Sequence, residues 1–262
     1  MLARLRSLFG AAPVDSQRSE RAHLSAPEWP AVVYAIGDVH GCLTELRGLE
    51  QRIVEDAAAI EGEKWLVYLG DLVDRGPESV GVLDRLLARP PQGFRRICLA
   101  GNHEIMMLAF LEDPASQPEW LQFGGQQTLA SYGIDAARLL ATPARQRRAI
   151  LDSHVPQDHV EFLADLPLTL SLPGVVFVHA GLRPDIPVDR QAENDLLWIR
   201  EEFFMAPPLP GRLVVHGHTP AKEAVILPGR ICVDTGAFAT GRLTAVRLSP
   251  DQEPRIIDYS RG

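Results

Sequence analysis

The segment VVYAIGDVHG, residues 32–41, joins a hydrophobic run to a polar cluster. The run, from Val32 to Ile36, ends at Gly37, which predicts a short buried strand. Asp38 and His40 follow directly. A helix is then predicted by apolar residues at helical spacing, namely Leu43, Leu46, Leu49, Ile53 and Val54. We therefore expect a strand, a polar loop and a helix, in that order.

The same arrangement recurs twice further along the chain. A strand at Trp65–Leu69 ends at Gly70-Asp71 and precedes a helix at Ser79–Ala88. A strand at Arg96–Leu99 ends at Gly101-Asn102-His103 and precedes a helix at Glu104–Leu111. The last third is rich in predicted strands: Leu168–Leu172, Val175–Val178, Leu213–Val215, Val225–Leu227, Ile231–Val233, Leu243–Leu248 and Ile256–Tyr259. This order predicts an α/β fold, a sandwich of two mixed sheets that pack face to face and are flanked by helices.

The chain divides into three predicted regions. Residues 1–29 are rich in Ser, Ala, Arg and Pro with weak periodicity, and we interpret them as a flexible N-terminal arm. Residues 30–262 form a single predicted domain. Within this domain, a mostly helical insertion is predicted from about residue 112 to residue 166.

Composition restricts the partners and the compartment. The formal net charge of −8 argues against broad binding to nucleic acid or to anionic lipid. No apolar run approaches the roughly 18 residues that span a membrane, and no secretory signal is evident. The three cysteines, Cys42, Cys98 and Cys232, indicate buried apolar residues rather than a disulfide framework. We expect a cytoplasmic protein that binds neither membrane nor nucleic acid, and the oligomeric state is left open.

Five polar clusters follow predicted strands: Gly37–Gly41, Gly70–Gly76, Gly101–Glu104, His179–Gly181 and His216–Thr219. Each one alone is compatible with an ordinary turn or a hydrogen-bonded histidine. Together they supply Asp, His and Asn side chains, which suit Mn, Fe or Zn. Because ligands of open α/β sheets lie beyond the carboxyl ends of strands, the sequence predicts a metal site there.

The motif order GDVHG, GDLVDRG, GNHE, HAG and GHT resembles the calcineurin-like metallophosphoesterases. Within that superfamily it is most similar to the phosphoprotein phosphatase branch that includes the bacteriophage lambda protein phosphatase and its bacterial relatives. The resemblance runs from about Tyr34 to Leu248 and extends to Trp120–Gly125, Asp195–Arg200 and Val233–Ala237. It implies a metallophosphoesterase domain that hydrolyses phosphomonoesters by in-line attack of a hydroxide held at a dinuclear metal centre.

The resemblance also assigns roles to matching positions. Two divalent ions are implied, with Mn preferred and Fe or Zn possible. The metal ligands would be Asp38 and His40 on the first ion, Asp71 bridging both, and Asn102, His179 and His218 on the second. His103 would be the general acid, oriented by Asp74, while Arg75 and Arg200 would hold the phosphoryl oxygens. These residue types suit phosphoryl transfer, which needs positioning and charge stabilisation.

Several residues depart from this pattern or are assigned other roles. Ala100 stands where the phage enzyme has an arginine, so one phosphate contact is missing. Glu104 is expected to begin a helix, and His216 to be structural rather than to support the metal. Asp234-Thr235-Gly236 matches the triplet of aspartic proteases, but it occurs once and we reject that interpretation. Arg200 has a simpler alternative as a surface arginine paired with Glu201 or Glu202. Three histidines are expected at the surface: His23, His154 and His159.

Three functions compete. The preferred one is a Ser/Thr-type protein phosphatase acting on phosphorylated protein or on small phosphoesters. The second is a dinucleoside polyphosphate hydrolase, resembling the symmetrical diadenosine tetraphosphatases. These typically lack an aspartate at the place of Asp74 and have GNHD where this chain has Glu104. A non-catalytic phosphate-binding module is the third, and it would require the loss of a ligand or of the acid, none of which is missing.

Overall fold

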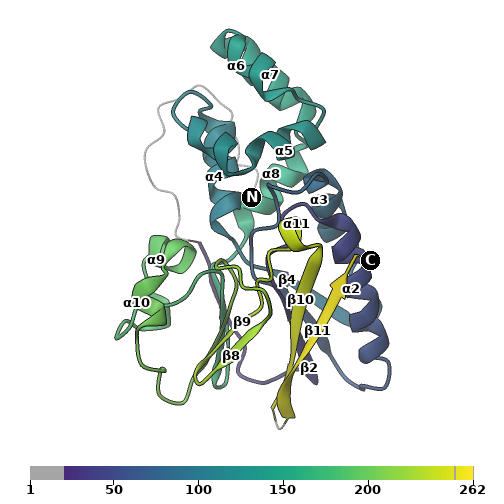
Figure 1. Cartoon of the computed structure of the whole chain (residues 1–262), viewed down its shortest axis with the longest axis vertical. Coiled ribbons are helices and arrows are strands. Elements are labelled where there is room, and N and C mark those ends of the chain that lie inside the picture. Colours follow the sequence, from purple (N-terminus) through teal and green to yellow (C-terminus); the bar gives the residue numbers. More distant parts are fainter. Residues whose placement is uncertain (1–20, 251, 262) are drawn as a thin grey trace.

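Two mixed sheets lie face to face in the computed structural model, which describes residues 21–250 and 252–261 (Figure 1). The five-stranded sheet has the order β11 (Gln252–Ser260), β10 (Arg242–Ser249), β2 (Val32–Ile36), β3 (Lys64–Tyr68) and β4 (Phe94–Cys98). The six-stranded sheet has the order β1 (His23–Ser25), β5 (Thr169–Leu172), β6 (Val175–Val178), β7 (Leu213–His216), β9 (Arg230–Cys232) and β8 (Val225–Leu227). Strands β2, β3 and β4 run parallel, as do β6, β7 and β9, so each set ends at one edge.

Helices cover the outer faces of the sandwich and extend beyond one end of it (Figure 1). The outer face of the five-stranded sheet carries α2 (Leu43–Asp56) and α3 (Ser79–Leu87). The helical middle comprises α4 (Asn102–Glu112), η1 (Pro118–Phe123), α5 (Gly125–Ser131), α6 (Ala136–Ala141), α7 (Ala144–His154) and α8 (Gln157–Asp165). Three short helices lie between β6 and β7: η2 (Val188–Arg190), α9 (Glu193–Trp198) and α10 (Glu201–Phe204). A fourth, α11 (Ala237–Thr240), packs against β10 of the five-stranded sheet.

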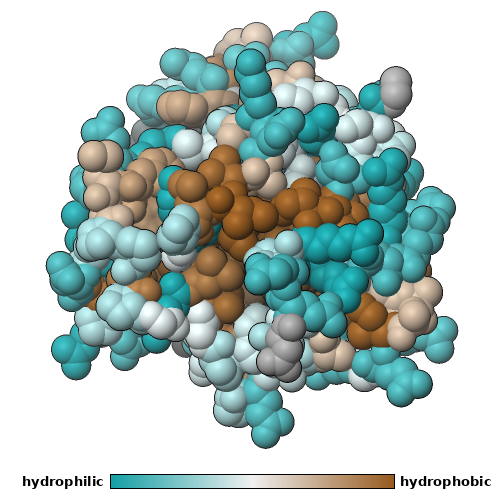
Figure 2. Space-filling model, turned by 60° about the horizontal axis from the view of Figure 1, so that its bottom comes forward, coloured by the Kyte–Doolittle hydropathy of each residue, from teal (hydrophilic) through white to brown (hydrophobic). Residues whose placement is uncertain are grey.

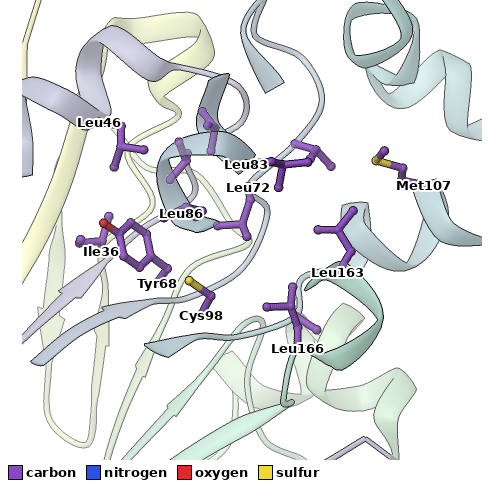
Figure 3. Close-up of a cluster of buried hydrophobic side chains, with 14 of the residues drawn as sticks. Ile36, Leu46, Tyr68, Leu72, Leu83, Leu86, Cys98, Met107, Leu163 and Leu166 are labelled. Atoms are coloured by element: carbon purple, nitrogen blue, oxygen red, sulfur yellow. The ribbon is translucent and has the colours of Figure 1, made fainter. Parts of the chain in front are cut away.

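Two hydrophobic cores explain why the strands are apolar throughout. Successive side chains of a strand point to opposite faces of the sheet. In β2, Tyr34 and Ile36 belong to the core under the helices, whereas Val33 and Ala35 belong to the core between the sheets. Figure 3 shows the first of these cores, with side chains from α2, α3 and α8 converging on those of the sheet. Both faces of β2 are therefore buried.

The end of the sandwich from which β2 and β3 begin is hydrophobic at its centre. Figure 2 brings this end forward and shows hydrophobic residues gathered in the middle of it, with hydrophilic ones around them. Partly buried apolar residues such as Leu24 and Leu213 pack against the core between the sheets. The polar loops predicted to hold metal lie at the opposite end, after the carboxyl ends of the strands.

The predicted fold class is confirmed, but the predicted N-terminal arm is too long. Residues 1–20 lie outside the described residues. Residues 21–29 are part of the domain, because His23–Ser25 forms β1 and pairs in parallel with β5. Trp29 Nε1 also donates a hydrogen bond to Pro173 O, at 2.9 Å. The domain therefore begins before residue 30, and a three-residue strand gives too short a pattern to be recognised in the sequence.

Two of the three histidines expected at the surface are not exposed. His159 is buried, and its Nδ1 lies 2.8 Å from Tyr132 Oη while its Nε2 lies 3.1 Å from Asp84 Oδ1. His23 is half-buried, with Nδ1 2.9 Å from Thr169 Oγ1. His154 is exposed, as expected. The prediction failed for His159 because neighbouring polar residues in the sequence do not reveal that α8 packs against α3 and α4.

The prediction about the three cysteines agrees with the structure. Cys42, Cys98 and Cys232 are buried and free. Among the helices of the described residues, none combines the length and the apolar character that crossing a membrane requires.

Candidate active site

The five polar clusters converge at one end of the sandwich, because the strands that carry them end there. Asp38 and His40 follow β2, Asp71 follows β3, and Asn102 follows β4. The second sheet contributes His179 after β6 and His218 after β7. All six predicted ligands are buried, with exposed fractions of 5% or less.

Asp71 lies between two groups of potential ligands. Its Oδ2 is 3.5 Å from His40 Nε2 and 3.8 Å from His103 Nε2. Its Oδ1 is 3.4 Å from His179 Nε2, which is in turn 2.9 Å from Asn102 Oδ1. The arrangement therefore contains two neighbouring sets that could each hold a metal ion, His40–Asp71–His103 and Asp71–His179–His218. Asp71 belongs to both sets, which is the position that a bridging carboxylate would occupy.

Hydrogen bonds orient the histidines toward the centre of this cluster. His40 Nδ1 donates to Val73 O and His179 Nδ1 donates to Leu69 O, both at 2.9 Å. The lone pair of each Nε2 is thereby turned to Asp71, an arrangement typical of metal-ligating histidines. Burial lowers the pKa of His40 to about 3, so its imidazole is neutral, the form that binds metal.

The centre of the ligand cluster contains closely packed carboxylates, and nearby positive charge would stabilise them. Burial raises the pKa of Asp38 well above its ordinary range, and Asp234 and Asp71 add to the effect. Ionised carboxylates packed together away from water are costly unless cations neutralise them. The carboxylate, amide and imidazole donors fit two divalent cations, and so does the negative charge of the carboxylates. Asp234 was not predicted as part of the site, although its triplet follows a strand as the other motifs do.

The backbone is strained where the predicted site residues lie. Among the described residues, six that are not glycine have positive φ angles, and five of them are His40, Asp71, Asp74, Arg75 and His218. Such conformations persist only when the surroundings enforce them, and they cluster at functional sites. One enforcing contact is at Gly217, where a Cβ would lie 2.0 Å from Asp38 Oδ1. The loops are thus packed too closely to relax.

His103 and Asp74 form the predicted acid pair. His103 Nδ1 lies 2.7 Å from Asp74 Oδ2, and Asp74 is fully buried. Trp120 Nε1 and Thr128 Oγ1 each donate to the Asp74 carboxylate at 2.7 Å, and these two partners were not predicted. Burial alone would lower the pKa of His103, but Asp71 and Asp74 outweigh it and raise the pKa above its ordinary value. His103 is therefore fixed in orientation, and the two carboxylates favour the protonated form of its imidazole.

Glu104 has a larger role than beginning α4. Its side chain accepts hydrogen bonds from the backbone N–H groups of Gly101, Asp71, Leu72 and Val73, at 2.8–3.2 Å. It thereby joins the loop after β4 to the loop after β3. Burial raises the pKa of Glu104 to about 7, with Asp71 adding to the effect. The sequence showed only the helix start, because three of the four partners lie 31–33 residues away.

The two arginines predicted to bind phosphate lie beside opposite halves of the cluster. Arg75 Nη2 is 3.2 Å from His103 Nε2, and its guanidinium lies over the ring of Phe238, 4.7 Å from the centroid. Arg200 is exposed, and its Nη1 donates to Thr219 Oγ1 at 3.0 Å. Within the described residues it makes no ion pair with Glu201 or Glu202, so the simpler surface alternative is not what the structure has. Thr219 directly follows His218, which places Arg200 at the second half.

Two half-exposed aromatic rings border the cluster, and neither was predicted as a site residue. Phe238 is 40% exposed and meets the ring of His40 edge-on, at 5.4 Å between centroids. Trp198 is 39% exposed and meets the ring of His218 edge-on at 6.1 Å. Each half of the cluster thus has one aromatic ring at its rim. In contrast, His216 is buried against Phe203 and Phe204, in keeping with the expected structural role.

The family is established by comparison with known proteins. A model of the calcineurin-like phosphoesterases matches residues 31–248, so the chain belongs to this family of phosphoester hydrolases. The expected superfamily is therefore confirmed, and the metal-binding residue groups are those of a metal-dependent hydrolase.

Two relatives of the chain carry names that differ from the predicted branch. The chain is 25% identical to bis(5'-nucleosyl)-tetraphosphatase PrpE [asymmetrical] of Anoxybacillus flavithermus, over 83% of this chain and 90% of that protein. It is 27% identical to the protein of the same name from Bacillus velezensis, over 86% and 92%. Both names are those of nucleotide hydrolases rather than of protein phosphatases.

Solved structures show the same fold. A putative diadenosine tetraphosphatase has 25% sequence identity and a TM-score of 0.63, and the match covers 93% of this chain and 100% of that one. A cold-active protein tyrosine phosphatase has 18% identity and a TM-score of 0.57, with 90% and 80% covered. The second likeness concerns the fold alone.

Proposed function

We propose that this protein hydrolyses bis(5'-nucleosyl) tetraphosphates, the function that ranked second from the sequence. The observation that carries the proposal is the match to tetraphosphatases over about nine tenths of their length. The motif argument for a protein phosphatase rested on Asp74 and Glu104. In the structure Asp74 orients His103 and Glu104 fastens two loops. The contacts of Glu104 do not select one phosphate compound over another, so only the part of the motif argument that rests on Asp74 keeps its weight.

The proposed metal site uses the predicted ligands. Two divalent ions would be held by Asp38, His40, Asp71, Asn102, His179 and His218. Once bound, such ions supply an activated water and neutralise charge on the phosphoryl group. We favour Mn, with Fe or Zn as alternatives, because the donor set of carboxylate, amide and imidazole suits all three.

The residues of the chain then position the polyphosphate and supply a proton. Arg75 and Arg200 bind phosphate oxygens from the two halves of the cluster, because guanidinium groups match phosphate in a bidentate way. Nε2 is the atom from which His103 would donate a proton, since Nδ1 is bound to Asp74 and Arg75 would turn from Nε2 to the phosphate. That proton is available to the departing oxygen.

The two aromatic rings at the rim support a nucleotide substrate. Phe238 and Trp198 border different halves of the cluster, and both are partly exposed. Base–aromatic stacking contributes roughly 1–3 kcal/mol per base. A substrate with a base at each end of a phosphate chain could use a ring on either side of the metals.

A protein phosphatase remains the second candidate, and the buried pair of His103 and Asp74 favours it. An anhydride between phosphates has a good leaving group that needs little protonation. The alkoxide that leaves from a phosphorylated serine needs a proton more strongly. A dedicated proton donor is therefore of greater use to an ester hydrolase.

Product analysis tests the proposal. With added Mn, diadenosine tetraphosphate should be cleaved, and anion exchange should separate either a triphosphate with a monophosphate or two diphosphates. Phe238→Leu and Trp198→Leu should each raise KM for this substrate by roughly 5–100-fold, because each removes one stacking ring. Inhibition by inorganic triphosphate, which has no bases, should hardly change. Intact tetraphosphate after prolonged incubation, with phosphopeptide consumed, would reject the proposal in favour of the second candidate.

A further inference from the structure

A basic pocket is lined by residues of α2, α3 and β4 and by residues just after α3, and none of them belongs to the five loops of the candidate active site. Its volume is about 420 Å³. Four arginines line it: Arg47 of α2, Arg85 of α3, Arg89 just after α3, and Arg96 of β4. None of them belongs to the motifs that the proposed function uses. Such a concentration of guanidinium groups is unexpected in a chain with a formal net charge of −8.

The positive charge of this pocket is only partly balanced. Glu50 is buried and binds both Arg85 and Arg96. Asp84 also lines the pocket, but its Oδ1 lies 3.1 Å from His159 Nε2. Within residues 21–250 and 252–261, no carboxylate lies within 4.0 Å of the guanidinium of Arg47 or Arg89. Four cations thus face two carboxylates, and the excess is positive.

Arg96 is fixed in place before any ligand arrives. Its side chain is 7% exposed, and its Nη1 donates to Leu86 O at 3.0 Å and to Ala88 O at 2.6 Å. Its Nε is buried and has no hydrogen-bond partner among the described residues. A donor that is already oriented loses little conformational freedom when a ligand binds. The buried nitrogen also leaves one hydrogen-bonding group still to be satisfied.

We propose that this pocket binds a compact polyphosphate anion, such as a diphosphate or a triphosphate. Guanidinium groups bind phosphate oxygens in pairs, and several of them suit an anion with several phosphates. The remaining lining residues are small, namely Gly81, Ala88 and Pro91. No aromatic side chain lines the pocket, so it lacks a surface on which a nucleobase stacks. The site is independent of the proposed function.

The test is a calorimetric titration of the metal-loaded full-length protein with methylenediphosphonate, a diphosphate that hydrolysis cannot cleave. Wild type should bind one equivalent more than the Arg47→Gln/Arg89→Gln variant, or bind it roughly 10-fold more tightly or better. Arg138→Gln/Arg145→Gln is the matched control, because it removes two exposed arginines elsewhere and changes the net charge equally. It should behave as wild type does. Any binding at the catalytic metals is common to all three proteins and cancels.

A second variant keeps the charge and changes the shape of the donor. Arg89→Lys should weaken binding less than Arg89→Gln does, but measurably, because an ammonium cannot form the paired contact. Melting temperatures of all variants should match wild type, since Arg47 and Arg89 are exposed. Equal stoichiometry and affinity in wild type and the Arg47→Gln/Arg89→Gln variant would overturn the proposal. So would an equal loss in the control, which would show that only net charge matters.

Discussion

At the residue scale, the proton carried by His103 separates the two candidate functions. Replacing His103 with Asn removes the imidazole that Asp74 orients, and with it the donated proton. For an alkyl phosphate such as phosphoserine, kcat should fall by roughly 10²–10⁴, the usual size of a general-acid contribution. For a tetraphosphate or an aryl phosphate the fall should be much smaller, because those leaving groups need no proton. Steady-state kinetics with the three substrates measures the difference.

Two controls accompany this substitution. Metal content by elemental analysis should stay near that of wild type, because the six predicted ligands remain. Asp74→Asn should affect the three substrates in the same order with a smaller loss, since it weakens the orientation and the proton affinity of His103 but leaves the imidazole in place. An equal loss for all three leaving groups would show that His103 does not donate a proton to the leaving group.

The residues that the sequence could predict are those whose neighbours in the chain form a motif. Asp38 and His40 lie in one motif directly after β2, and Asp71 lies in the next motif directly after β3. Phe238 and Trp198 could not be predicted, because an aromatic residue in a helix of only a few residues gives no sign of whether it will be buried. Their place at the rim depends on contacts with Arg75, His40 and His218, which the fold creates.

At the scale of elements, the loops after β3 and β4 depend on Glu104. Its carboxylate accepts four buried backbone N–H groups, and each group left without a partner costs roughly 1–3 kcal/mol. Glu104→Ala should therefore lower the free energy of unfolding by at least about 2 kcal/mol, as measured by urea denaturation. Metal binding should weaken as well, because Asp71 is in one of the two loops. Glu119→Ala, at an exposed position of η1, is the control and should be near neutral.

A contrary result would be a stable Glu104→Ala protein with unchanged metal affinity. Glu104 would then be no more than the beginning of α4.

Strands that are buried on both faces were the easiest elements to predict. β2 and β6 have apolar residues throughout, and the structure places them at the predicted residues. β1 was missed because three residues carry no usable period, and its pairing with β5 joins segments about 145 residues apart. The burial of His159 was missed for a similar reason, since it depends on the packing of α8. Pairings between distant segments depend on the whole fold, so the sequence of either segment alone gives little indication of them.

At the scale of the whole molecule, both activity and stability should depend on bound metal. Asp38, Asp71 and Asp234 are buried together, and their mutual repulsion disfavours the folded state unless cations are present. Chelation should abolish hydrolysis of an aryl phosphate and lower the melting temperature. Added Mn should restore both, because a ligand that binds only the folded state stabilises it. Full activity in excess chelator, with no metal found by elemental analysis, would contradict a two-metal site.

The order of the motifs along the chain was enough to predict the family, and each strand brings its loop, with the predicted ligands, to one end of the sandwich. The substrate was not predicted in the same way. It depends on the rim, where Arg200 and the two aromatic rings lie, and no motif of the chain describes that surface. The similarity to proteins named as tetraphosphatases therefore outweighs the argument for a protein phosphatase that rests on two residues, Asp74 and Glu104.

One comparison of rates separates the proposed function from the second candidate. The protein is supplied with Mn, and kcat/KM is measured for diadenosine tetraphosphate and for a phosphoserine peptide under the same conditions. We expect the tetraphosphate to be preferred by roughly 100-fold or more, since each stacked base adds about 1–3 kcal/mol to its binding. A higher kcat/KM for the phosphopeptide would contradict the proposal and identify the site as that of a protein phosphatase.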